Sequence, residues 1–300
     1  MPICRDQLEA WSQQPDSFFP EWTLQVLTEA LQDARRLAPL RYEIFVQGSY
    51  ANDTNIRGDG DVDLVIQLNL PLEEQLHELT PDEKHEFWKS YESTDYGWEE
   101  FREDVLGVLR RRYFVHAGRK CVGIHDLDSL LRLPADVLPA IEYRRYRAFP
   151  SLAGEEYDEG VFFRDLGDPQ QRAITNFPKL HLTNGRAKNR RTGGRFKEVI
   201  RVSKNARLHE SAGIAKGVAP SYFVECLLYN VPDKIYRASL SGAYVAAWRW
   251  LLEHLPEIRT FRCQNELVDI FGDLPDQWDL PAAETLIRAL NTQWQQWRCP

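Results

Sequence analysis

Two short apolar runs separated by a polar loop constrain this chain more than any other feature. The first run lies within residues 42–46 and the second within residues 62–68. Apolar runs of this length, rich in Ile and Val, predict short buried β-strands. A Gly48-Ser49 pair directly follows the first run, and Asp61 and Asp63 lie at the start of the second. We therefore expect two neighbouring strands with polar, chemically useful residues where the loop joins them.

The spacing of the two aspartates has a chemical reason. Residues i and i+2 of a strand point to the same face, so Asp61 and Asp63 would present both carboxylates on one side. Carboxylate oxygens are hard ligands that suit Mg²⁺. The Gly48-Ser49 turn would let backbone amides and a hydroxyl approach a phosphate closely. Metal on one strand and phosphate donors on its neighbour are what the transfer of a nucleotidyl group requires.

Each half of this pattern also has an ordinary structural interpretation. A Gly-Ser pair alone is a common turn, and an Asp-x-Asp alone is common at strand ends. Asp59 even forms a rival Asp-x-Asp with Asp61, although Gly58 and Gly60 flank Asp59 and place it in a turn. The combination of strand, Gly-Ser, polar loop and Asp-x-Asp is what favours the functional interpretation.

These residues resemble the DNA polymerase β-like nucleotidyltransferase superfamily. The longer string QGSYANDTNIRGDGDVDLVI, residues 47–66, is similar to the bacterial relatives of cyclic GMP–AMP synthase (CD-NTases), which act in anti-phage signalling (CBASS). The resemblance extends over about residues 20–255, and within 174–232 it is similar to the E clade, some of whose members use uridine nucleotides. It implies an α/β (α+β) nucleotidyltransferase lobe with an N-terminal helix, residues 1–165, and a helical nucleotide-binding lobe, residues 166–300.

A third carboxylate usually completes a two-metal site. The candidate is Asp136, which precedes an apolar run in RLPADVLPAIEYRRY; the string resembles the family's third-acid strand. Asp126 and Asp128 are rivals, but they precede a Leu pair and suit a loop and helix start. The resemblance thus implies that Asp61, Asp63 and Asp136 are catalytic and hold Mg²⁺, with Mn²⁺ as an alternative.

Charge is distributed unevenly along the chain. The net charge is −8, which argues against a general nucleic-acid binder, yet residues 179–207 carry ten Lys or Arg and one acidic residue. Lys197, Arg201 and Lys204 follow helical spacing there, opposite an apolar face. A solvated basic face is one interpretation. The family resemblance implies the other, in which Lys204 binds the triphosphate.

Further nucleotide-binding residues follow from the resemblance. It implies that Gln47, Gly48, Ser49 and Ser221 contact the triphosphate and that Tyr222 stacks on the donor base. The spacing alone makes Ser221 a helix N-cap and Tyr222 a core residue. Asn176 could read a pyrimidine edge with its amide, or be a turn residue before Phe177-Pro178. His181, on an apolar pattern, is expected to be a core or rim residue.

Composition limits the setting in which the protein works. Five cysteines are scattered without a CxxC pair, which is typical of reduced thiols in a cytoplasmic protein. Early charges exclude a secretory signal, and the longest apolar runs are too short to span a membrane. We expect a monomer that binds nucleoside triphosphates and acts on a downstream effector through its product, without a membrane or specific nucleic-acid partner.

The resemblance implies a cyclic dinucleotide synthase that uses UTP, ATP or both. Two alternatives stay open on the sequence. One is another polymerase β-like nucleotidyltransferase that modifies tRNA or protein. The other is a non-enzymatic nucleotide-sensing relative, which the loss of a metal carboxylate would favour; all three carboxylates are present.

Overall fold

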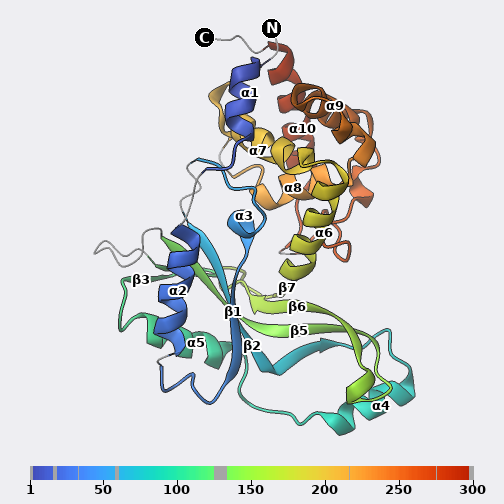
Figure 1. Cartoon of the computed structure of the whole chain (residues 1–300). Coiled ribbons are helices and arrows are strands. Elements are labelled where there is room, and N and C mark those ends of the chain that lie inside the picture. The colour runs from blue at the N-terminus through green and yellow to red at the C-terminus, as the bar shows by residue number, and fades with distance from the viewer. Residues whose placement is uncertain are drawn as a thin grey trace. The chain divides into compact units, whose positions relative to one another are not determined.

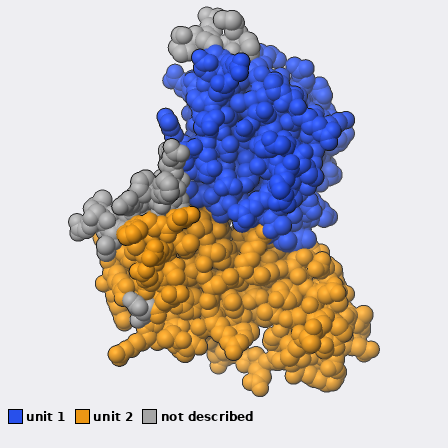
Figure 2. Space-filling model, viewed as in Figure 1, with its two compact units in different colours: residues 1–16, 48–59, 180–300 blue, residues 17–47, 60–179 orange. Residues whose placement is uncertain are grey.

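The computed structural model describes residues 3–15, 19–32, 34–57, 61–124, 134–215, 217–274 and 276–296. Contacts divide the chain into two compact units, coloured blue and orange in Figure 2. Unit 1 comprises Met1–Asp16, Gly48–Asp59 and Leu180–Pro300, and unit 2 comprises Ser17–Gln47 and Gly60–Lys179. Each unit is therefore assembled from separate stretches of sequence, and the chain leaves unit 2 for unit 1 between Gln47 and Gly48.

Unit 2 is built on a β-sheet (Figure 1). The described strands form a seven-stranded sheet in which β2 and β5 are central and parallel, while the other pairings are antiparallel. Their bounds are β1 Arg41–Val46, β2 Val62–Gln75, β3 Val115–Ala117, β4 Val122–Ile124, β5 Ala135–Ala148, β6 Glu156–Arg164 and β7 Ala173–Asn176. The strands expected around residues 42–46 and 62–68 are confirmed, and the apolar strings VLPAIEYRRY and GVFF, which also predict strands, lie within β5 and β6.

Helices of unit 2 cover apolar surface of this sheet. They are α2 Phe19–Gln32, α4 Pro81–Ser90 and α5 Trp98–Leu109. Trp98 donates a hydrogen bond from Nε1 to the carbonyl of Pro139 at 2.8 Å, which fixes α5 against β5. Strand alternation places Val62, Leu64 and Ile66 on one face of β2 and leaves Asp63 on the other. One face of the sheet is thus apolar, while the opposite face carries polar residues.

The structure corrects two expectations about the charged segments of unit 2. The charged residues 72–90 predict one surface helix, but residues 72–75 continue β2 and only α4 is helical within this range. Pairing of Glu73–Gln75 with Tyr143–Arg145 of β5 explains the difference, because a partner strand overrides local helix propensity. The charged residues 98–112 predict a second surface helix, but α5, which forms there, buries Phe101 and Val105 completely.

Unit 1 is helical around one large apolar core. Its helices are α1 Arg5–Ser12, α3 Gly48–Ala51, α6 Pro178–Arg191 (whose first two residues belong to unit 2), α7 Arg195–Leu208, α8 Ser221–Asn230, α9 Leu240–Glu253 and α10 Leu280–Gln296. The apolar face expected on α7 is confirmed, since Phe196, Val199, Ile200 and Ser203 are all buried. The string KNRRTGG, residues 188–194, predicts a loop, but Lys188–Arg191 extend α6 and only the following Gly193 and Gly194 turn the chain. No described helix is long and apolar enough to cross a membrane.

Candidate functional site

The parallel pairing of β2 and β5 brings two of the expected metal ligands together. Asp63 lies directly opposite Asp136 in the register of the two strands, and both are half-buried. Side chains of residues opposite each other in neighbouring strands point to the same face. The two carboxylates therefore project side by side from the polar face of the sheet in unit 2.

The pKa of Cys121, which lies just before β4, reflects the negative charge of Asp63 and Asp136. Burial raises the pKa of the Cys121 thiol, and the carboxylates of Asp136 and Asp63 raise it further, to about 12. A neighbouring negative charge disfavours the thiolate. Both aspartates thus act on the same nearby group, in agreement with their register on the strands, and Cys121 stays a neutral thiol.

Asp61 lies just outside the regular strand. β2 begins at Val62, and Asp61 is exposed. Among the residues that the structure describes, no three His, Cys, Asp or Glu side chains are gathered closely enough to form a metal cluster. The register pair of Asp63 and Asp136 nevertheless supplies hard carboxylate oxygens from two rigid strands, which fits a Mg²⁺ or Mn²⁺ ion. The rival acids Asp59, Asp126 and Asp128 lie outside the described residues.

The Gly48-Ser49 turn follows β1 directly. Gln47 donates its backbone N–H to the carbonyl of Asp63 at 2.8 Å, which ties the end of β1 to the start of β2 within unit 2. Gly48 then adopts a φ of 69°, a left-handed conformation that a glycine accepts without a steric penalty. Gly48 and Ser49 begin the one-turn helix α3 in unit 1. The expected turn is confirmed, while its phosphate role stays a prediction.

The basic face of α7 is buried rather than solvated. Lys197, Arg201 and Lys204 are 6%, 9% and 0% exposed. Their cationic groups bind the segment that follows α3: Lys197 pairs with the Asp53 carboxylate at 2.7 Å, and Arg201 donates to the Asp53 carbonyl at 2.6 Å. Asp53 itself has a φ of 53°. This face therefore holds the chain just beyond Ser49, and the interpretation as a solvated helix is wrong.

Lys204 lies at the centre of a buried polar cluster. Its Nζ pairs with Glu225 Oε1 at 2.6 Å and donates to the carbonyl of Thr54 at 3.1 Å. The hydroxyl of Thr54 donates to the same carboxylate at 2.7 Å, and His181 Nε2 lies 3.3 Å from its other oxygen. Burial would raise the pKa of Glu225, but Lys204 and His181 outweigh it and lower this pKa to about 2.

The polar cluster around Glu225 contains two residues singled out in the sequence, His181 and Lys204. His181 is 3% exposed and bonded to Glu225, so its expected structural role is confirmed. Lys204 has its expected place on α7, but its ammonium is fully engaged within unit 1. Sequence reasoning missed Thr54 and Glu225. The available signal for Glu225 was a single acid inside the otherwise apolar string SYFVECLLYN.

Ser221 and Tyr222 begin α8. The N-cap position belongs to Pro220, so Ser221 is the first helical residue rather than the expected cap; its Oγ accepts a bond from Arg207 at 3.2 Å. The Tyr222 ring stacks on His181, with centroids 5.1 Å apart and an interplanar angle of 25°. Burial raises the pKa of the Tyr222 phenol, and the thiols of Cys226 and Cys263 raise it further.

Asn176 ends β7 in unit 2. Its side-chain Oδ1 accepts the backbone N–H of Phe177 at 2.8 Å, which is the local bond expected of a turn residue. A carbonyl oxygen has a second lone pair, and the amide nitrogen has two hydrogens. The local bond therefore fixes the orientation of the amide without exhausting its capacity to bind a base.

Comparisons with known proteins match both parts of this architecture. The family model described as a nucleotidyltransferase domain matches residues 27–162, and the one described as the cGAS/DncV-like nucleotidyltransferase C-terminal helical domain matches residues 183–295. A cyclic UMP-AMP synthase from Rhodothermus marinus is 37% identical over 99% of both chains. The chain belongs to the cGAS/DncV-like nucleotidyltransferases. The boundary expected at residues 165 and 166 stays a prediction: it falls between the two matched segments, whereas the compact units divide this part of the chain between Lys179 and Leu180.

Two further matches support the same family assignment for this nucleotidyltransferase. A cyclic nucleotide synthase, CdnE01, from Staphylococcus haemolyticus is 34% identical over 99% of this chain and 100% of its own. The solved Rhodothermus marinus CdnE c-UMP-AMP synthase, with Apcpp and Upnpp, superposes with a TM-score of 0.87 at 36% identity, covering 100% of this chain and 99% of the other. The expected combination of an α/β nucleotidyltransferase fold with a helical C-terminal domain is thereby confirmed.

Proposed function

We propose that this chain synthesises a cyclic dinucleotide from nucleoside triphosphates, with UTP and ATP as the favoured substrates. The observation that carries the proposal is the register pair of Asp63 and Asp136, in a chain that matches cyclic nucleotide synthases over its full length. The product would serve as a second messenger in anti-phage defence through a downstream effector. We further infer that the enzyme works as a monomer and needs no specific nucleic acid.

The proposed reaction is attack by a ribose hydroxyl of one nucleotide on the α-phosphate of another. The new O–P bond forms as the bond to pyrophosphate breaks, and the hydroxyl proton is released. Mg²⁺ or Mn²⁺ held by Asp61, Asp63 and Asp136 would favour the attacking alkoxide and neutralise charge on the phosphates. A second transfer between the two joined nucleotides, releasing a second pyrophosphate, closes the ring.

The other residues would bind and orient the nucleotides. Gln47, Gly48 and Ser49 are proposed to bind phosphate, the Gly48 conformation bringing backbone amides close to it. Ser221 and Lys204 are proposed to bind the triphosphate as well, although Lys204 must first exchange its present partners. Tyr222 would stack on the donor base with the ring face that His181 does not cover.

Product analysis tests the proposal directly. The purified protein is incubated with all four nucleoside triphosphates and either Mg²⁺ or Mn²⁺, and the products are identified by mass spectrometry. We expect a cyclic dinucleotide containing uracil and adenine without any polymer acceptor. Nucleotide added only to tRNA or to a protein would support the alternative transferase. A folded protein that binds nucleotide but yields no product would support the sensor.

Base preference gives a residue-level prediction. Asn176→Ser should shift incorporation toward purines without abolishing activity, because Ser cannot reach the O4 and N3–H edge of uracil as the Asn amide can. One bidentate contact contributes roughly 1–3 kcal/mol of base discrimination, so the expected shift is about ten- to a hundred-fold. Labelled-nucleotide incorporation measures the shift.

The neighbouring substitution Thr175→Ser provides the matched control for this prediction. It changes a side chain on the same strand without touching the amide, so its base ratio should stay that of the wild type. A wild-type product made only of purines, or an unchanged ratio in Asn176→Ser, would leave Asn176 as a turn residue alone.

A further inference from the structure

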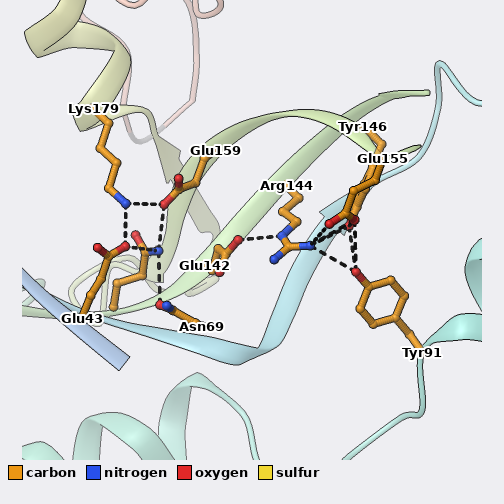
Figure 3. Close-up of polar contacts among 10 residues, drawn as sticks. Glu43, Asn69, Tyr91, Glu142, Arg144, Tyr146, Glu155, Glu159 and Lys179 are labelled. Carbon is orange, nitrogen blue, oxygen red and sulfur yellow. Dashed lines mark hydrogen bonds and ion pairs between the residues drawn. The ribbon is translucent and has the colours of Figure 1, made fainter. Parts of the chain in front are cut away.

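A single lysine links three segments of unit 2 directly above the polar face of the sheet. Lys179, in the first turn of α6, donates from Nζ to Glu43 of β1 and to Glu159 of β6, each at 2.5 Å (Figure 3). The same ammonium lies 5.1 Å from the centre of the Phe45 ring. We call Glu43, Glu159 and Lys179 the lysine clamp. It joins the start of α6 to strands on both sides of the sheet centre.

The clamp is connected to β2, the strand that carries Asp63. Gln67 Nε2 donates to Glu43 at 3.0 Å and to Glu159 at 3.1 Å, using the same carboxylate oxygens that Lys179 binds. Gln67 is four residues from Asp63 on β2, so strand alternation places both on the same face. The clamp and the Asp63–Asp136 pair therefore share one face of the sheet.

The chain segment that ends at Lys179 starts at Asn176, the last residue of β7, where the chain turns toward α6. Phe177 is 3% exposed and packs edge-on against Tyr143, with ring centroids 6.0 Å apart. A Cβ on Gly160 of β6 would lie 2.6 Å from the Asn176 carbonyl oxygen and 2.9 Å from the Phe177 ring. The turn thus lies tightly on β6 at a position where only glycine leaves enough room.

We propose that Lys179, through Glu43 and Glu159, is a positioning residue that holds the turn after Asn176 in place, and so sets the position of the Asn176 amide and the enzyme's preference among bases. The inference rests on the proposed function, in which Asn176 reads a base. Only Phe177 and the conformationally restricted Pro178 separate Asn176 from Lys179. Fixing Lys179 to β1 and β6 therefore fixes the chain on the far side of the amide.

The solvent exposure of these ion pairs favours a positioning role for Lys179 over a role in global stability. The side chains of Lys179, Glu43 and Glu159 are 39%, 38% and 33% exposed. Ion pairs with this much solvent access contribute little to global stability. Catalytic and recognition geometry is far more sensitive, because a displacement of about 1 Å can cost roughly a hundred-fold in rate. Loss of the clamp should therefore change specificity much more than folding.

Lys179 carries its positive charge at neutral pH. Burial alone would lower the pKa of Lys179, but the bonds to Glu159 and Glu43 outweigh it and raise this pKa above its ordinary value. Lys179 consequently remains an ammonium ion wherever the enzyme works.

Steady-state kinetics with separate nucleotides test the clamp. In Lys179→Met, we expect the pyrimidine-over-purine preference to fall about ten-fold, mainly through a higher KM for the pyrimidine nucleotide, with kcat for the purine nucleotide nearly unchanged. Lys179→Arg keeps the charge and should retain most of the preference. Arg145→Met is the matched control. It removes a similarly exposed ion pair, between Arg145 of β5 and Glu78, that is not part of the lysine clamp.

A double variant separates positioning from a general effect. If Lys179 acts through the amide, Lys179→Met/Asn176→Ser should show the same base preference as Asn176→Ser alone. Gly160→Ala should mimic the loss of preference without removing any charge, since its methyl group displaces the turn. Thermal unfolding should stay close to that of the wild type in Lys179→Met, which shows that the fold is kept.

The outcomes distinguish this inference from the proposed function. A wild-type protein that yields no cyclic product refutes the proposed function itself. A cyclic product whose base ratio is unchanged in Lys179→Met refutes the clamp, as do fully additive effects in the double variant. Equal loss of preference in Arg145→Met would also overturn it, because any surface ion pair would then suffice.

Discussion

Replacing Asp61 and Asp63 together with Asn should reduce product formation by about a thousand-fold or more while leaving the fold intact. Asn keeps the size of the side chain but removes the negative charge that a divalent cation requires. A divalent metal at this site would contribute several kcal/mol of transition-state stabilisation, and each 1.36 kcal/mol corresponds to a factor of ten in rate. Pyrophosphate release and mass spectrometry of the product give the rates.

The fold should survive this substitution because of where the side chains lie. Asp61 is exposed and Asp63 is half-buried on the polar face of β2, so neither carboxylate holds the apolar core together. Glu74→Gln, an acid further along the same strand, is the matched control and should remain active. Near-normal turnover in a folded double variant would contradict the metal-site prediction.

Lys204→Met should destabilise the protein more than any other single substitution on the basic face of α7. The lysine is completely buried, and its removal leaves the Glu225 carboxylate without its cationic partner. Breaking a buried pair on one side costs about 3–5 kcal/mol. For a domain of 150–250 residues, each kcal/mol lowers Tm by roughly 2–4 °C. Calorimetry and urea unfolding at pH 7 measure the loss.

The matched control for this prediction is Lys197→Met. Lys197 lies on the same helix and is also buried, but its partner Asp53 is 47% exposed and can be solvated after the substitution. It should therefore lose much less stability than Lys204→Met. Adding Glu225→Gln to Lys204→Met should restore part of the loss, because the uncompensated charge is then removed as well. Equal losses in the two single variants would show that buried charge is not the cause.

The effect of pH gives this prediction a definite sign. The folded-state pKa of Glu225 is lowered to about 2, so its stabilising contribution is fully present above the ordinary value of 4.5 and disappears as pH falls toward 2. Without Lys204, the largest influence that lowers this pKa is lost, so the buried carboxylate is protonated more readily and the variant is relieved in acid. The stability difference between wild type and Lys204→Met should therefore shrink between pH 7 and pH 3.

Burial of Lys204 also sets the conditions for testing its proposed nucleotide contact. Lys204→Ala is expected to raise the apparent KM for nucleotide and to lower kcat if the contact strengthens in the transition state. Those constants are meaningful only at a temperature where the variant remains folded. Unchanged affinity and turnover under such conditions would limit Lys204 to holding Glu225 and Thr54 in unit 1.

The sequence by itself determined most of the local structure and located the carboxylates of the predicted metal site. Apolar runs located β1, β2 and β5, and the apolar string SYFVECLLYN, which predicts a helix, coincides with α8. The paired aspartates and the glycine turn marked a nucleotide-transfer motif before any long-range contact was known. These features depend on residues that are near one another in the chain, where spacing alone fixes which side chains share a face.

Only the tertiary structure decided which distant segments meet. The register of Asp63 with Asp136 depends on strand pairing across more than 70 residues, and a slip of one residue would turn the carboxylates to opposite faces. Helical spacing showed that Lys197, Arg201 and Lys204 share a face, but could not show that Asp53 and Thr54 cover it. A helix face with charged residues has the same sequence pattern whether water or a buried partner binds those charges. The periodicity shows only which residues share a face, and it does not show what packs against that face.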